Sequence, residues 1–184
     1  MPHRQELREL LKQAWSATVQ GPYRHQEINS ERGLQVHFCA TLLPLLSKRP
    51  RRLFIEPRVV VSSRDTSVFP DILICSERAV IAVVELKYTP RAKPSIDGDL
   101  SKLRAFGASE EIIKVANERF RGKRGAPVKY TLAKSAFLCW AGIYCGTEVQ
   151  VNLGARSKLN GRLLLLHART AEGKHAEPTF SGAC

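Results

Sequence analysis

An apolar run that ends abruptly in charges is the feature that most limits the folds open to this chain. Residues 79–84 are apolar on both faces of a strand, and the triplet Glu85-Leu86-Lys87 follows at once. A strand of this kind is typical of the centre of a sheet that is covered on each side. We therefore expect residues 79–88 to form a central strand with polar groups gathered at its end.

The preceding segment predicts the hairpin partner of this strand. Residues 69–75 are rich in strand formers, and a polar turn, Ser76-Glu77-Arg78, separates the two segments. If the turn centres on residue 78, Asp71 faces Glu85 across the hairpin. Because side chains alternate along a strand, Glu85 and Lys87 share one face and residue 86 points the other way. Two acids and a lysine then converge at one edge of the hairpin.

Such a cluster suggests a metal site. Two carboxylates on adjacent strands, with the backbone carbonyl of residue 86 nearby, form the hard oxygen site that Mg²⁺ prefers. A lysine on the same face can stabilise charge on a phosphate or orient the attacking water. The alternative is a salt bridge between Lys87 and Asp71 or Glu85. Placement at the polar end of a buried strand favours the functional interpretation, since an ordinary ion pair belongs on an exposed face.

The rest of the pattern predicts one mixed α/β layer fold. Apolar residues recur at helical spacing in three segments, and further segments are rich in strand formers. Pro57 cannot donate a ladder hydrogen bond, so its strand is expected at an edge or with a bulge. We expect helices at 4–18, 25–46 and 99–120, further strands at 53–61, 134–144 and 162–168, and a single domain over 1–184 with an N-terminal helix (1–20), a core (25–170) and a flexible tail (171–184).

The charge balance points to a polyanionic partner. Lys and Arg number 29 against 17 Asp and Glu, which gives a net charge of +12. Nucleic acid is the leading candidate partner for so basic a domain, although charge can also serve solubility alone. The longest apolar run is too short to span a bilayer, and residues 1–15 do not resemble a signal peptide. We expect a cytoplasmic protein with no membrane partner.

Cysteine and histidine give no sign of a zinc site. The five cysteines include no pair at the Cys-x-x-Cys spacing, and the five histidines show no ligand spacing. We expect reduced thiols and no zinc.

Four sequence elements together resemble the PD-(D/E)xK nuclease superfamily, which has the restriction-endonuclease-like fold. Pro70-Asp71, thirteen further residues and then Glu85-Leu86-Lys87 match its central motif. Members commonly carry a glutamate on the helix before the first strand, which Glu31 matches, with Glu27 one helical turn earlier as its competitor. Asp99-Leu100-Ser101-Lys102-Leu103 matches the start of a helix after the motif. The resemblance covers roughly residues 25–145.

The resemblance implies a fold, an activity and a set of roles. The fold would be a mixed β-sheet flanked by α-helices, and the activity Mg²⁺-dependent hydrolysis of phosphodiester bonds, most naturally in DNA, with Mn²⁺ able to substitute. Asp71, Glu85 and Glu31 would be the metal-binding and catalytic acids. Lys87 would be the catalytic lysine, and Lys102 would contact phosphate.

Two basic segments are candidates for holding a nucleic-acid backbone. The first is residues 48–52, and the second is residues 119–124, which follow the helix expected to open beside the site. We favour the second for that reason, with Arg119, Arg121, Lys123 and Arg124 as its cations. Either segment could instead be a solvated loop.

Two other classes of function stay open. The chain could be a catalytically inactive nucleic-acid-binding module of the same fold, or a basic adaptor whose paired acids are accidental. Retention of all the motif acids and of Lys87 argues against lost activity. The chain leaves no room for a large target-reading domain, so recognition of a long site would need inserted loops or a homodimer.

Overall fold

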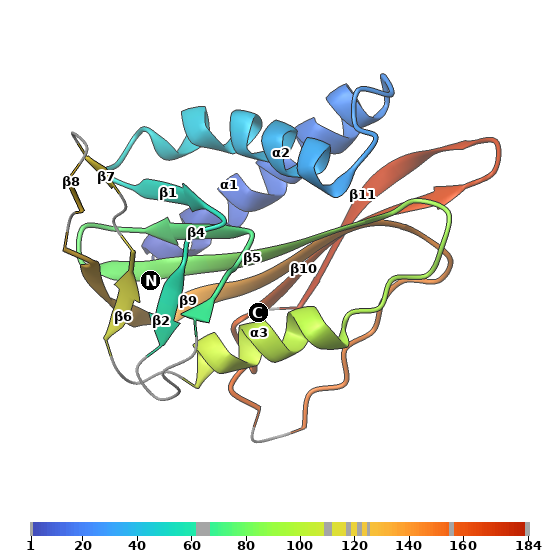
Figure 1. Cartoon of the computed structure of the whole chain (residues 1–184). Coiled ribbons are helices and arrows are strands. Elements are labelled where there is room, and N and C mark those ends of the chain that lie inside the picture. The colour runs from blue at the N-terminus through green and yellow to red at the C-terminus, as the bar shows by residue number, and fades with distance from the viewer. Residues whose placement is uncertain are drawn as a thin grey trace.

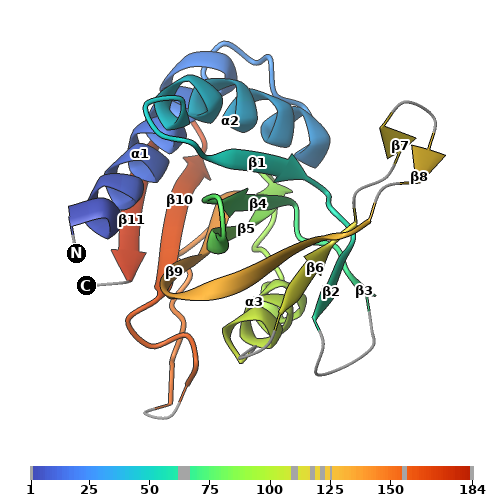
Figure 2. The same cartoon turned by 90° about the vertical axis from the view of Figure 1, so that its left-hand side faces the viewer.

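A mixed sheet divides the molecule into two hydrophobic layers (Figures 1 and 2). The structure is a computed structural model that describes residues 2–61, 67–108, 112–116, 119–120, 123–124, 126–154 and 157–182. Within these ranges nine strands form the sheet and two more form a small separate ribbon. The mixed α/β architecture expected from the sequence is confirmed.

The helices are α1 (Pro2–Thr18), which continues as a π-helical turn (Val19–Tyr23), α2 (Glu31–Leu46) and α3 (Asp97–Gly107). The strands are β1 (Arg52–Ile55), β2 (Val59–Val61), β3 (Ser67–Val68), β4 (Ile72–Cys75), β5 (Ala79–Thr89), β6 (Ile113–Val115), β7 (Arg119–Phe120), β8 (Lys123–Arg124), β9 (Val128–Cys145), β10 (Leu163–Ala171) and β11 (Lys174–Gly182).

Strand β5 lies at the centre of the sheet, as its apolar run predicts. It pairs antiparallel with β4 on one side and parallel with the long strand β9 on the other. Strand β9 also pairs parallel with β10 and antiparallel with β6. The resulting order is β1-β4-β5-β9-β6-β2-β3, with β10 and β11 added beside β9.

Each face of the sheet is covered by a different layer of helices. Helices α1 and α2 pack together on one face, where Trp15, Phe38 and Leu86 belong to one buried cluster. Helix α3 covers the other face, where Phe106 and Trp140 belong to a second cluster. No helix in the described ranges combines the length and apolarity that a membrane span needs.

Helix α2 begins later than expected. The sequence predicted a helix over 25–46, but the chain before Glu31 forms turns, and Gln26 has a positive φ of 61°. Ser30 is extended, and its side-chain oxygen accepts a hydrogen bond from the Gly33 N–H at 3.0 Å. This N-cap satisfies one of the free N–H groups of the first turn and fixes the start of the helix.

The third expected helix is half as long as predicted. Helix α3 ends at Gly107, where an added Cβ would lie 3.0 Å from Leu138 Cδ1 and 3.2 Å from the carbonyl oxygen of Lys158. Close packing against the sheet thus favours glycine at the helix end. The segment that follows is strand rather than helix, because Ile113–Val115 pairs with both β2 and β9.

Two further expectations need correction. The single strand predicted over 53–61 is two strands, because the chain turns at Glu56, whose φ is 44°; its first part, β1, is an edge strand as Pro57 suggested. The tail over 171–184 was expected to be flexible, but its described part contains β11, which pairs with β10 from Leu164↔Gly182 to Ala171↔Lys174. None of the residues of β11 is fully buried, so the sequence there lacks the apolar pattern that would have predicted a strand.

Candidate functional site

The two motif acids meet at the end of the β4–β5 hairpin. The register runs from Ile72↔Val84 to Ile74↔Ala82, as the predicted turn requires, and Asp71 directly precedes β4. The Leu86 N–H donates a hydrogen bond to Asp71 Oδ2 at 2.6 Å. Glu85 is completely buried in β5. The hairpin therefore brings Asp71 to the strand that carries Glu85, as expected.

The cation that contacts these acids is Lys102. Its Nζ lies 2.5 Å from Glu85 Oε2, while 39% of its side chain remains exposed. Helix α3 is held in place one turn earlier, where Asp99 accepts a hydrogen bond from Trp140 Nε1 at 3.1 Å. Trp140 is the β9 neighbour of Glu85, so this contact anchors α3 directly beside the site. The resemblance placed Lys102 near the site without indicating this ion pair.

Lys87 lies against a different acid. Its Nζ is 3.7 Å from Glu31 Oε2, and the same oxygen accepts a hydrogen bond from the Tyr88 N–H at 3.2 Å. The sequence had suggested a salt bridge between Lys87 and either Asp71 or Glu85 as the alternative to a metal site. In the structure Lys87 pairs with Glu31 instead, and Glu85 pairs with Lys102. Glu31 opens α2, whereas Glu27 lies before the helix in an exposed turn. Glu31 is therefore the helix acid that reaches the end of β5.

Gln35, which the sequence analysis missed, holds the backbone of Asp71 through a hydrogen bond. Gln35 lies one helical turn after Glu31, is buried, and donates a hydrogen bond from Nε2 to the Asp71 carbonyl oxygen at 3.1 Å. The Glu56 N–H donates to the same oxygen at 2.9 Å. The i, i+4 spacing from Glu31 is the signal that could have identified Gln35.

Burial shapes the ionisation of the cluster. It raises the pKa of Glu85 to about 8, against the opposing hydrogen bond from Lys102, and the Asp71 charge adds to the rise. Burial also raises the pKa of Asp71, against the Leu86 N–H and the Lys102 charge. The pKa of Lys102 is raised, because its hydrogen bond to Glu85 and the neighbouring acids outweigh its own burial. The acids thus favour a nearby cation.

The carboxylate oxygens of the site can be compared with the ligands that a metal ion needs. Glu85 Oε1 is buried and has no hydrogen-bond partner within the described ranges, so it is free to ligate. A cavity of about 240 Å³ opens beside Asp71 and is lined also by Glu31, Gln35 and Leu86. The described residues contain no group of three or more His, Cys, Asp and Glu side chains close enough to hold a metal. Two carboxylates still suit Mg²⁺, which commonly keeps several waters and takes few protein ligands.

The predicted basic loop is not beside this cluster. Arg119 and Arg124 belong to β7 and β8, which pair as a small ribbon, and Arg121 lies outside the described residues. Figure 1 shows the ribbon far from the connection between β5 and α3. The argument for this segment assumed a helix running to residue 120, and that helix ends at Gly107. The backbone of Lys123 pairs with that of Phe120 in the ribbon.

A basic groove lies instead next to the end of β5. It has a volume of about 680 Å³ and is lined by Tyr88, which follows Lys87 in the strand. The rings of Tyr23 and Tyr88 meet edge to face, with centroids 6.3 Å apart. None of the described residues that line the groove is acidic, and its basic side chains are Arg24, Arg91, Lys174 and His175. The sequence analysis missed this groove because its cations come from separate segments, one of them the expected tail.

Comparisons with protein-family models, with curated proteins and with solved structures found no match for this chain.

Proposed function

We propose that this protein is a metal-dependent nuclease that hydrolyses phosphodiester bonds, most naturally in DNA. The observation that carries the proposal is the convergence of Asp71 and Glu85 at the end of a buried hairpin, where Glu85 Oε1 has no hydrogen-bond partner among the residues that the structure describes. A buried acid pair with perturbed pKa values is a functional-site candidate with a physical reason.

The order of elements supports the resemblance to the PD-(D/E)xK superfamily. The helix that carries Glu31 comes first, the antiparallel strands that present Asp71 and Glu85 follow, and the helix that carries Lys102 comes next. A restriction-endonuclease-like fold accordingly forms part of the proposal, as does the matching of Glu31 to the helix glutamate of that superfamily.

Each acid then has a role. Asp71 and Glu85 would hold Mg²⁺, or Mn²⁺ in its place, and Glu31 would complete the acidic set from the side of the cavity. Bound Mg²⁺ would supply Lewis-acid chemistry and lower the pKa of a water molecule. Gln35 and the Leu86 N–H hold Asp71 in position, and burial excludes water from Glu85.

The two lysines have separate roles in this proposal. Lys102 neutralises the acid pair, because its ammonium contacts Glu85 directly. Lys87 is the catalytic lysine, since Glu31 holds its ammonium at the exposed end of β5, where it can stabilise charge on a phosphate. The adjacent groove would hold the nucleic-acid backbone with Arg24, Arg91 and Lys174 and stack bases on its tyrosines.

One observation favours a second candidate, a catalytically inactive nucleic-acid-binding module. The Lys102 ammonium already neutralises Glu85, and the described residues offer no group of three metal ligands. In that case the cluster would only stabilise the fold, and the basic groove would carry the function.

A plasmid-nicking assay distinguishes the two candidates. Wild-type protein should nick supercoiled DNA with Mg²⁺ and not with EDTA, and Asp71→Ala should be inactive while still binding DNA. Asp97→Ala is the matched control, because it removes an exposed acid from the first turn of α3. Equal nicking by wild type and Asp71→Ala would contradict the nuclease proposal, and DNA binding without nicking by wild type would favour the module.

A further inference from the structure

A third pocket lies at the end of strand β4 opposite to the acid pair. Strand β4 begins just after Asp71 and ends just before Ser76, and Ser76 lines this pocket. The four residues of β4, five steps along the chain, separate Asp71 from Ser76 by roughly 17 Å. The pocket therefore belongs to another part of the molecule, and what it binds does not depend on the proposed nuclease activity.

The floor of this pocket is apolar. Leu7, Ile81 and Phe137 line it, and the guanidinium of Arg4 lies over the Phe137 ring, 4.8 Å from its centroid. The cavity has a volume of about 470 Å³. That size is within the range of pockets for small organic ligands, roughly 300–1,000 Å³, and exceeds what a bare ion needs.

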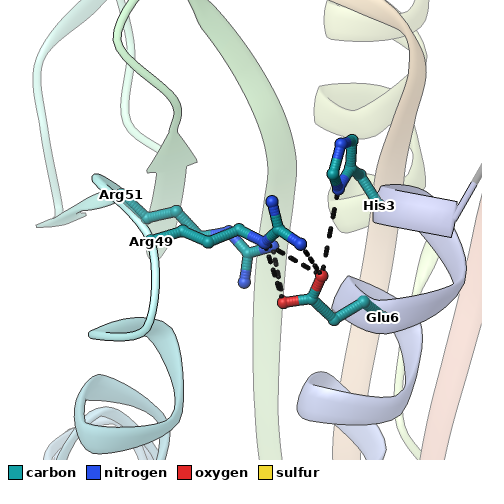
Figure 3. Close-up of polar contacts among 4 residues, drawn as sticks. All are labelled: His3, Glu6, Arg49 and Arg51. Carbon is teal, nitrogen blue, oxygen red and sulfur yellow. Dashed lines mark hydrogen bonds and ion pairs between the residues drawn. The ribbon is translucent and has the colours of Figure 1, made fainter.

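The walls of the pocket are positively charged. Four arginines line it, against one lining carboxylate, that of Glu77. A second carboxylate, Glu6, accepts hydrogen bonds from Arg49 Nε at 3.0–3.1 Å and from Arg51 Nη2 at 3.3 Å (Figure 3). The excess of guanidinium over carboxylate leaves positive charge for an anion. The arginines of the lining are Arg4, Arg49, Arg51 and Arg78.

Two guanidinium groups in the wall are incompletely paired within the described ranges. Only 5% of the Arg51 side chain is exposed, and no group in the described ranges accepts a hydrogen bond from its Nη1. Arg4 Nε is also buried, and no described group accepts a hydrogen bond from it. Buried donors are nearly always satisfied, and a charged one left unpaired is costly. Both residues line the pocket, so each guanidinium retains a donor that a side-chain rotation would turn toward a bound anion.

We propose that this pocket binds an organic phosphate with a flat apolar body, of the nucleoside monophosphate class. Guanidinium groups bind phosphate in a planar, bidentate geometry. The apolar floor and the Arg4–Phe137 stack suit a flat body above them. The source is either a free nucleotide or the 5′-phosphorylated end of a nucleic acid, since both present this chemistry.

Calorimetric titration of the full chain with adenosine 5′-monophosphate, in a buffer of low ionic strength, tests the proposal. Saturable binding is expected, with adenosine and inorganic phosphate each at least about tenfold weaker, because each lacks one half of the ligand. Absence of saturable binding would overturn the proposal. Equal affinity for adenosine would overturn the phosphate role, and equal affinity for inorganic phosphate would overturn the apolar one.

Variants locate the site. Arg78 is exposed, so Arg78→Ala should keep the fold and weaken the nucleotide about tenfold. Arg104→Ala, which removes an equal exposed charge from α3, should leave the affinity unchanged. Glu6→Gln should strengthen binding severalfold, because it removes the carboxylate that competes for Arg49 and Arg51. Equal effects of Arg78→Ala and Arg104→Ala, or weaker binding by Glu6→Gln, would contradict this placement.

Competition identifies the source of the phosphate. A short oligonucleotide with a 5′-phosphate and its 5′-hydroxyl counterpart are each titrated against bound adenosine 5′-monophosphate. Displacement by the phosphorylated oligonucleotide alone supports the proposal and assigns the site to a nucleic-acid end. Displacement by neither supports it and assigns the site to the free nucleotide, whereas equal displacement by both would show that the phosphate end is not what the pocket recognises.

Discussion

Lys102 Nζ lies 2.5 Å from Glu85 Oε2, so helix α3 places an ammonium directly on the buried carboxylate of β5. The two residues come from opposite ends of the long connection between the strand and the helix. Their contact divides the cluster into two pairs, Lys102 with Glu85 and Lys87 with Glu31. Glu85 is completely buried whereas Glu31 is exposed, so substitutions of the two lysines can separate the roles of the two pairs.

Lys102→Ala should make the protein depend on metal for stability. Removal of one partner of a buried pair costs up to about 3–5 kcal/mol, reduced here because Lys102 is partly exposed and Glu85 can take up a proton. In EDTA we expect a lower Tm than for wild type, and a larger rise in Tm with Mg²⁺, since the ion can replace the lost ammonium. Thermal unfolding with and without Mg²⁺ measures both.

Arg104→Ala, on the same helix, is the control for Lys102→Ala. It should give the same rise in Tm with Mg²⁺ as the wild type. A Mg²⁺-induced rise in Lys102→Ala no larger than in this control would show that no metal enters at Glu85.

Lys87→Ala should lose about a hundredfold in nicking rate, the usual size of one electrostatic contact with the transition state. Metal binding should survive, because the Lys87 ammonium contacts Glu31 rather than Glu85. Rates of wild type, Lys87→Ala and the exposed control Lys93→Ala are measured across a Mg²⁺ titration. Convergence of the Lys87→Ala and wild-type rates at high Mg²⁺ would mean that Lys87 only neutralises the site.

The metal-free protein should lose stability as the pH rises toward 8. Burial raises the pKa of Glu85 from 4.5 to about 8, so the folded state binds more protons than the unfolded state between these values. The free energy of unfolding then falls with pH in that window, by up to about 1.4 kcal/mol per unit. Urea unfolding in EDTA from pH 5 to 9 should show this slope in wild type and a flatter one in Glu85→Gln. Equal pH slopes in wild type and Glu85→Gln would contradict the assignment of the raised pKa to Glu85.

The groove beside Tyr88 should carry most of the salt dependence of DNA binding. Each phosphate contact contributes about 0.9 to the slope of log affinity against log salt concentration. Arg91→Ala with Lys174→Ala should therefore reduce the slope by about two. The triple variant Arg121→Ala, Lys123→Ala, Arg124→Ala is the comparison, and a larger loss of slope in that variant would place the DNA on the small ribbon.

The local pattern of the sequence predicted the β4–β5 hairpin correctly. The short polar turn Ser76-Glu77-Arg78 fixes the register, because the turn and its length set which residues of a hairpin lie opposite each other. Residues 79–84 therefore located the central strand, and the register placed Asp71 at its end. Asp71 and Glu85 were found from the sequence for this reason.

The features that the sequence did not predict depend on contacts between segments that lie far apart in the chain. Ile113–Val115 continues an apolar pattern that fits a helix, yet it forms a strand because β2 and β9 offer it two partners. Strand β11 is polar and owes its structure to β10. The contact of Lys102 with Glu85 depends on the anchoring of Asp99 by Trp140, which lies far away in the chain.

We propose above all that Asp71 and Glu85 hold a divalent metal ion. Paramagnetic resonance of Mn²⁺, titrated with protein, measures this binding directly and does not depend on the choice of nucleic-acid substrate. We expect one bound Mn²⁺ per chain in wild type and in Asp97→Ala, and no bound Mn²⁺ in Asp71→Ala and Glu85→Gln. Free Mn²⁺ throughout the titration of wild-type protein, or binding that both Asp71→Ala and Glu85→Gln retain, would contradict it.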